Sequence, residues 1–140
     1  MLELHLEGID NLEMVVKVEC GDLKSILKLK QLQAGSSLMI GFVMVGTNNL
    51  DKATKFYDTL LGTIELQRVV TNENYAGYAL NKKPDDVEFY VTNPVNKEMA
   101  TFGNGTQISF LVNSKDIVNS FYNTGIRLGG KDEGAPGIRS

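Results

Sequence analysis

Two stretches of the chain, 65 positions apart, carry nearly the same sequence. Residues 49–62 read NLDKATKFYDTLLG, and residues 114–126 read SKDIVNSFYNTGI. A shift of 65 positions places Phe56 on Phe121 and Tyr57 on Tyr122. Because an internal repeat means that one supersecondary unit has been built more than once, it constrains the fold more than any single element does. The sequence therefore predicts two units that share one plan.

Each copy predicts a strand followed by a helix. Asn49 and Ser114 stand at equivalent positions, and their side-chain oxygens can accept hydrogen bonds from the free N–H groups of a helix start. Behind each cap, apolar residues recur at steps of three and four, which is typical of a helix with one buried face. The apolar runs IGFVMVG and TQISFLV precede the caps and predict buried strands.

The first unit, residues 39–95, continues with three further strands. The stretches TIELQRVV, NYAGYAL and VEFYVT have strand character, and TNEN and NKKPDD between them have turn composition. The second unit, residues 105–140, has only twelve residues after Leu128, namely GGKDEGAPGIRS. We therefore expect a second unit that lacks its last three strands.

Residues 1–38 form a segment of their own, rich in strand patterns. LELHLEG and LEMVVKVE predict two strands, whereas residues 22–33 fit a helix as well as a strand. An unpaired sheet edge invites association. We expect either these N-terminal strands or a second chain to complete the open edge of the second unit.

Composition excludes several functional classes. The net charge is −3 without any cluster of lysine and arginine, which argues against nucleic-acid binding. No apolar run reaches the ~18 residues of a membrane span. A lone cysteine, Cys20, and the absence of a secretory signal pattern favour the reducing cytoplasm. The one histidine, His5, alternates with leucines and is expected to be a strand residue of no catalytic role.

From residue 39 onward the sequence resembles the glyoxalase/bleomycin-resistance/dioxygenase-like members of the vicinal oxygen chelate superfamily. Four segments carry the resemblance in the correct order: MIGFVMVGTNNLDKATKFYDTLLG, VEFYVTNP, FGNGTQISFLVNSKDIVNSFY and KDEGAPGIR. The resemblance implies an α+β fold of paired βαβββ modules, whose curved mixed sheet forms an open cup around a substrate or metal. It also implies a homodimer, since the cup of this fold is often completed between chains.

In this superfamily the metal ligands usually come from the first strand of each module and from late strands. The repeat places Phe42 and Gln107 at the two first-strand positions. Phenylalanine cannot coordinate a metal, and a single glutamine is a weak ligand beside imidazole or carboxylate. The glutamate that the family often carries on its last strand would lie beyond Ser140. We expect no catalytic metal and no cofactor, and Glu88 is the one acidic residue of interest near the cup.

The expected function is the binding or sequestration of a small amphipathic or aromatic molecule, without catalytic residues. Aromatic walls with a few polar groups suit such a ligand. Strand aromatics can also pack beneath a helix, because alternation sends neighbours such as Phe89 and Tyr90 to opposite faces. Two alternatives stay open: a metal-dependent lyase, isomerase or dioxygenase, and a rearranged gene product that has lost the ancestral activity. The candidate ligand-binding residues are Phe42, Tyr75, Tyr78, Glu88, Tyr90 and Gln107.

Overall fold

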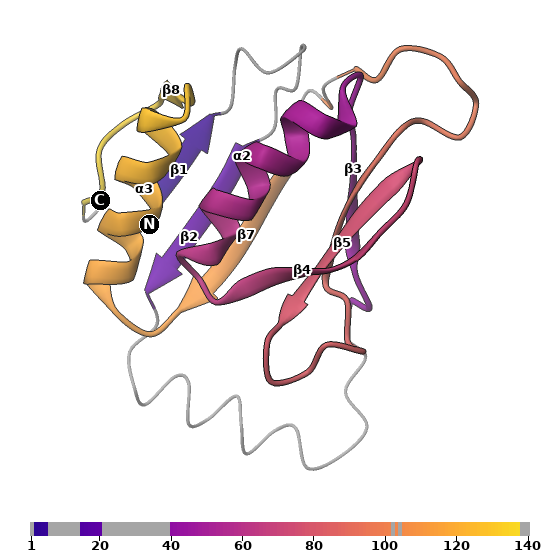
Figure 1. Cartoon of the computed structure of the whole chain (residues 1–140). Coiled ribbons are helices and arrows are strands. Elements are labelled where there is room, and N and C mark those ends of the chain that lie inside the picture. The colour runs from indigo at the N-terminus through magenta and orange to yellow at the C-terminus, as the bar shows by residue number, and fades with distance from the viewer. Residues whose placement is uncertain (1, 6–14, 21–39, 102, 104, 138–140) are drawn as a thin grey trace.

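The two described helices confirm the repeat residue by residue. The computed structural model describes residues 2–5, 15–20, 40–101, 103 and 105–137 (Figure 1). Helix α2 spans Leu50–Gly62 and helix α3 spans Lys115–Arg127, so both ends are 65 positions apart. Asn49 Oδ1 accepts a hydrogen bond of 2.9 Å from the amide of Lys52, and Ser114 Oγ accepts one of 3.2 Å from that of Ile117. The two helices therefore start by the same capping interaction.

The strands divide into two four-stranded mixed sheets of the same design. The first sheet has the order β3-β6-β5-β4, with β3 parallel to β6 and the other neighbours antiparallel. Its strands are β3 (Val43–Gly46), β4 (Leu66–Thr71), β5 (Tyr75–Leu80) and β6 (Phe89–Thr92). All of them come from the first unit, which is therefore a complete βαβββ module, called module one below.

The second sheet repeats this arrangement with strands from both ends of the chain. Its order is β7-β2-β1-β8, with β2 parallel to β7 and β1 antiparallel to both of its neighbours. The strands are β1 (Leu2–His5), β2 (Val15–Cys20), β7 (Gln107–Val112) and β8 (Lys131–Asp132). With α3 they form module two.

Comparison of the two sheets shows which strands of module two are equivalent to which strands of module one. Strand β2 occupies in module two the place that β6 has in module one, and β1 occupies the place of β5. The short strand β8, which the sequence pattern did not reveal, follows α3 as β4 follows α2. The predicted α+β fold of paired βαβββ modules is confirmed, and N-terminal strands complete module two. The open question of residues 22–33, helix or strand, lies outside the described residues, as does the expected boundary between residues 38 and 39.

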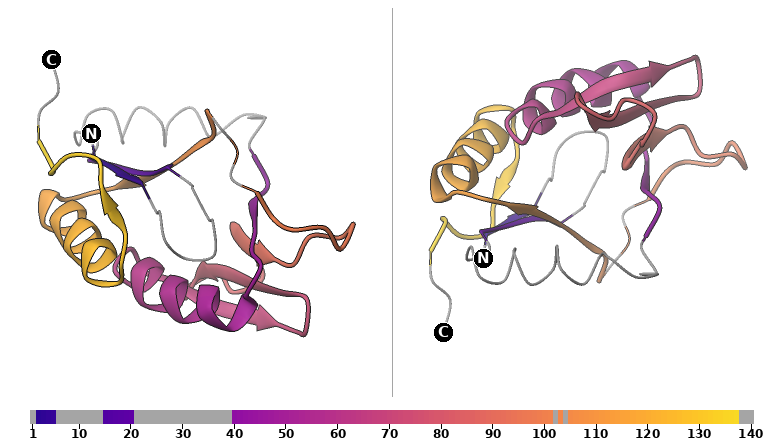
Figure 2. Two further views of the ribbon diagram at one scale, coloured as in Figure 1. Left: turned by 90° about the horizontal axis from the view of Figure 1, so that it is seen from above. Right: turned by 90° about the horizontal axis from the view of Figure 1, so that it is seen from below.

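Each helix covers one sheet, and the helices also touch each other. Helix α2 packs on β4, β5 and β6, whereas α3 packs on β1 and β2. The helices lie side by side along one side of the molecule (Figure 2). Between helices and sheets lies one apolar core, whose largest fully buried side chains are Tyr57, Tyr78, Phe89, Phe121, Leu60, Leu61 and Val91.

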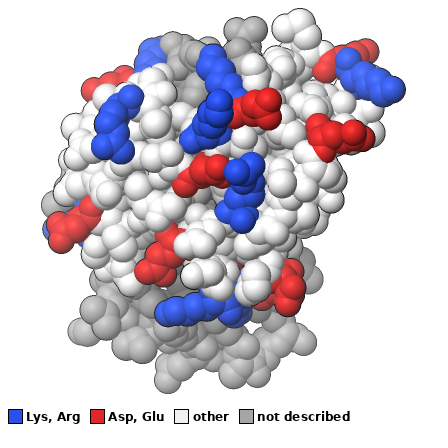
Figure 3. All heavy atoms as spheres, in the orientation of Figure 1, with Lys and Arg blue, Asp and Glu red and all other residues white. Residues whose placement is uncertain are grey.

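Positive and negative side chains are interspersed over the face seen in Figure 3. Two ion pairs illustrate the pattern, Arg68 with Asp58 at 3.1 Å and Lys83 with Asp86 at 3.7 Å.

Neither α2 nor α3, the helices of the described residues, has the length and apolar character that crossing a bilayer requires.

Candidate functional site

The strands of module one present two different faces. On one face Val43, Phe89 and Val91 join the core beneath α2. Because successive side chains of a strand point to opposite sides, their neighbours Phe42, Met44 and Tyr90 belong to the face turned away from the helix. Phe42 and Met44 are 54% and 53% exposed, respectively. Module one therefore offers accessible apolar surface on the side that α2 does not cover.

Three aromatic side chains on this face contact one another. The ring centroids of Phe42 and Tyr90 are 5.2 Å apart with an interplanar angle of 76°, and those of Tyr75 and Tyr90 are 5.8 Å apart at 74°. Edge-to-face pairs of this geometry are favourable because the positive ring edge meets the negative ring face. We call Phe42, Tyr90 and Tyr75 the aromatic row. It runs from the residue that precedes β3, across β6, to β5.

Gly77 makes room for the central ring of the aromatic row. It stands opposite Tyr90 in the pairing of β5 with β6. A Cβ atom at Gly77 would lie 2.8 Å from Tyr90 Cε1 and 2.7 Å from Val70 Cγ1, closer than side chains can approach. The absence of a side chain at this position therefore lets the Tyr90 ring lie over β5.

Tyr78 lies on the other side of the sheet, contrary to the expectation that it faces a ligand. Its side chain is fully buried among core residues, and its hydroxyl donates a hydrogen bond of 3.0 Å to Asp58 Oδ1 on α2. Burial, followed by the charge of Asp58, raises the pKa of Tyr78 above its ordinary value. Tyr78 is three residues from Tyr75, and an odd spacing on a strand sends two side chains to opposite faces.

Glu88 and Gln107 are exposed, and of the two Gln107 stands apart from the aromatic row, in the other sheet. Glu88 immediately precedes β6, and its backbone carbonyl accepts a hydrogen bond of 2.9 Å from the amide of Val43. Gln107 begins β7 in the other sheet, where its Nε2 donates to Ser109 Oγ at 3.1 Å. The aromatic row thus contains three of the six candidate residues, and Glu88 lies beside it, two residues before Tyr90.

The residues at the family's metal-ligand positions do not fit a catalytic metal. The ring of Phe42 packs against Tyr90 and has no donor atom, and Gln107 offers one amide oxygen. Hard and borderline cations are held in proteins by several carboxylate, imidazole or thiolate groups. Within the described ranges, no three or more His, Cys, Asp and Glu side chains come together. We therefore derive no chemistry through a metal at these positions.

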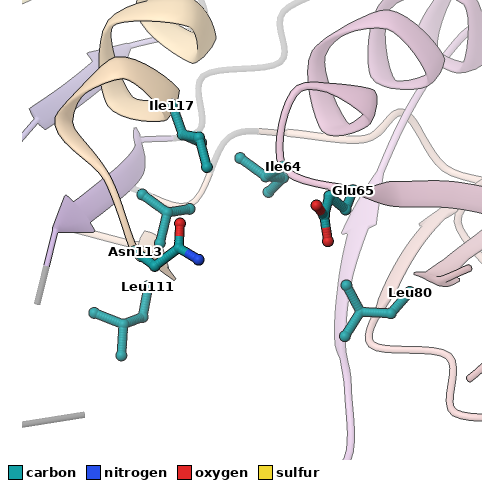
Figure 4. A pocket seen from close by; sticks show the side chains of 7 residues that line it. Ile64, Glu65, Leu80, Leu111, Asn113 and Ile117 are labelled. Atoms are coloured by element: carbon teal, nitrogen blue, oxygen red, sulfur yellow. The ribbon is translucent and has the colours of Figure 1, made fainter. Parts of the chain in front are cut away.

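The structure also contains a cleft that the sequence did not predict. A cleft of about 260 Å³ lies where the end of β7 and the first turn of α3 meet the loop after α2 and the end of β5. Figure 4 shows side chains from both modules around it. Because its walls come from three separate segments, at residues 64–65, 80 and 111–117, no local pattern predicts their convergence. The labelled lining residues are Ile64, Glu65, Leu80, Leu111, Asn113 and Ile117.

The comparisons with known proteins identify a relative among the solved structures. No protein-family model matches the chain, and no curated protein matches it significantly. Among solved structures, the chain is similar to the crystal structure of a glyoxalase/bleomycin resistance protein from Albidiferax ferrireducens T118. The TM-score is 0.65 and the sequence identity 37%, over 73% of this chain and 82% of that chain. The chain therefore belongs to the glyoxalase/bleomycin resistance proteins of the vicinal oxygen chelate superfamily.

Proposed function

We propose that this protein binds a small aromatic or amphipathic molecule on the aromatic row and carries out no metal-dependent reaction there. The observation that supports the proposal is the contact chain from Phe42 through Tyr90 to Tyr75, on the sheet face opposite α2. Phe42 is more than half exposed although it is one of the most apolar residue types. A ligand that covered it would remove that apolar area from water.

The row offers a ligand two kinds of interaction. Its ring faces and edges can stack on a planar molecule, and such contacts contribute about 0.5–1.5 kcal/mol each beyond area burial. The hydroxyls of Tyr75 and Tyr90 can donate to or accept from polar groups at the rim of that molecule. A ligand with a flat apolar body and polar ends satisfies both demands. Specificity would then rest on the positions of the two hydroxyls.

We also propose that the protein acts as a cytoplasmic homodimer. In the described sheets, β3 and β7 are edge strands, and edge strands tend to find partners. Large apolar side chains are exposed on or beside them, with Ile40 at 82% and Leu111 at 56%. Light scattering should give twice the monomer mass across concentrations; a monomer at every concentration would contradict this part of the proposal.

The binding proposal is tested by titration calorimetry with two probes. Bleomycin is one, because the similar solved protein is described as a bleomycin resistance protein, and 8-anilinonaphthalene-1-sulfonate is a simpler planar amphipathic molecule. Phe42→Ala and Tyr90→Ala should each weaken binding about tenfold, the equivalent of 1.4 kcal/mol. Val95→Ala is the matched control, since Val95 is exposed apolar surface on a loop beyond β6.

Equal affinity of the wild-type protein and Phe42→Ala for both probes would contradict the proposal. The metal-dependent alternative is tested separately by the metal content of the purified protein after dialysis. Stoichiometric iron, zinc, nickel or manganese would favour a lyase, isomerase or dioxygenase. A folded protein that binds neither probe would favour loss of the ancestral activity.

A further inference from the structure

The cleft between the two modules combines an apolar wall with polar groups at its rim. Ile64 and Leu80 from module one and Leu111 and Ile117 from module two supply the apolar part. Glu65 and Asn113 supply a carboxylate and an amide, and Figure 4 shows them facing the space from opposite sides. Among the described residues, no lysine or arginine lines the cleft. Its electrostatic character is therefore set by Glu65.

Both polar groups are available to a ligand. Glu65 and Asn113 are exposed, and within the described part of the chain neither side chain takes part in a hydrogen bond or ion pair. The start of α3 nearby does not need an anion, because Ser114 Oγ caps it and Asp116 lies in its first turn. A cation is the partner that a free carboxylate recognises most strongly.

The backbone of Glu65 lies in a region that glycine adopts more readily than glutamate. Glu65 has φ = 67°, a left-handed conformation that favours glycine. In module two the corresponding turn after α3 contains Gly129 with φ = 101°. The two modules thus have different residues at positive φ in this turn. Of the two turns, the one in module one carries a carboxylate. A residue kept in an unfavourable conformation is a reason to look for function.

We propose that this cleft binds a small primary amine with an apolar body. The ammonium group would lie between the Glu65 carboxylate and the Asn113 side-chain oxygen, and the apolar body would cover Leu80 and Leu111. The cleft volume of about 260 Å³ is below the ~300–1,000 Å³ typical of sites for drug-sized ligands, so the amine is small. This site is separate from the aromatic row and does not depend on the function proposed above.

The proposal is tested by NMR titration of the full chain with 2-phenylethylamine. We expect saturable shifts of the backbone amides at residues 64–66 and 111–113. The compound 3-phenylpropionate has a similar body with the opposite charge and should bind at least fivefold more weakly. Glu65→Gln, which keeps the size of the side chain, should weaken binding of the amine at least fivefold. Asp85→Asn removes one exposed carboxylate from a turn away from the cleft and should leave binding unchanged.

Three results would overturn the proposal. They are equal binding of the carboxylate probe, unchanged affinity in Glu65→Gln, and shifts centred on Phe42, Tyr75 and Tyr90. The last result would instead support the aromatic row as the binding surface. Should Glu65→Gln fail to fold, the salt dependence of the wild-type affinity decides the question. Affinity for the amine should fall as salt rises, because an exposed ion pair is screened, and a salt-independent affinity would contradict the proposal.

Discussion

The hydroxyl of Tyr78 donates a hydrogen bond of 3.0 Å to Asp58 Oδ1, while Arg68 Nη2 lies 3.1 Å from Oδ2 of the same carboxylate. One side chain of α2 thereby contacts both β5 and β4. Tyr78 is fully buried, whereas Asp58 on α2 and Arg68 on β4 each have more than a third of the side chain exposed. Asp58 thus provides a hydrogen-bond acceptor for a tyrosine hydroxyl that is buried in the core of module one.

Stability should fall at alkaline pH because of two buried phenols. Burial raises the pKa of Tyr57, and burial together with Asp58 raises the pKa of Tyr78. The unfolded chain releases these protons above about pH 10, whereas the folded chain keeps them. The free energy of unfolding should therefore be independent of these groups below about pH 10 and decrease as pH rises beyond it. Urea unfolding between pH 8 and 11 measures this, and a rising stability in that range would contradict it.

Replacing Tyr57 by phenylalanine should stabilise the protein. Among the described residues, the Tyr57 hydroxyl is buried and has no hydrogen-bond partner. Removing it eliminates a desolvated polar group, which is worth about 1 kcal/mol or more. Tyr122→Phe is the matched control, because this repeat equivalent is hydrogen-bonded to Asp132. Urea unfolding should show a gain for Tyr57→Phe and none for Tyr122→Phe; equal effects would refute the explanation.

Gly77→Ala should disturb the aromatic row. The added methyl group would clash with Tyr90 and Val70, so the Tyr90 ring must move away from β5. Overpacking of this kind lowers the free energy of unfolding by about 1–3 kcal/mol, and affinity for both probes should fall. Gly62→Ala is a suitable control, because a Cβ there meets nothing within 4 Å. Unchanged probe affinity in folded Gly77→Ala would show that the ring position does not matter.

Glu65→Gly should raise stability while removing amine binding. Glycine adopts positive φ without strain, and the relief at φ = 67° is worth about 1 kcal/mol. Glu65→Ala is the control, since alanine removes the carboxylate but keeps the strain. Thermal unfolding should rank Glu65→Gly above both the wild-type protein and Glu65→Ala. If the alanine variant gains as much as the glycine variant, backbone strain is not the cause.

Moving strands β1 and β2 to the end of the chain should preserve the fold. Strand β1 pairs antiparallel with β8, with Leu4 opposite Asp132 and His5 opposite Lys131. In the plan of module one, the strand in the position of β1 comes after the strand in the position of β8. A chain that starts at residue 40 and carries residues 1–20 behind residue 140 through a short flexible linker should give the same circular-dichroism spectrum. An unfolded product would indicate that the native order is required.

The repeat is the reason why so much of the fold was predictable. Helical periodicity and caps recur at a fixed distance, so two weak local signals became one strong signal for α2 and α3. Pairing of the N-terminal strands could be anticipated from the open edge, but the choice between the same chain and a second chain could not. Both choices satisfy the same backbone hydrogen bonds, and only the three-dimensional path of the chain distinguishes them.

The candidate site was less predictable than the fold. Phe42 and Tyr90 meet across strands β3 and β6, whose parallel register no local sequence pattern specifies. Tyr78 could have been separated from Tyr75 by their odd spacing alone. The cleft around Glu65 depends on how the end of α2 packs near the end of β7, which is a tertiary relationship. The ligand-binding role of the aromatic row stays a prediction, as do the homodimer and the cytoplasmic location.

The parallel pairing of β2 with β7 has a consequence for biosynthesis. Val15 pairs with Gln107, and 92 positions separate them. At about 5–20 residues per second, a ribosome needs roughly 5–20 s to make the second partner after the first. Module one contains its own strands and can fold during that interval, while the first-made strands still lack their neighbour. During translation, β2 therefore stays without its parallel partner until β7 has been made.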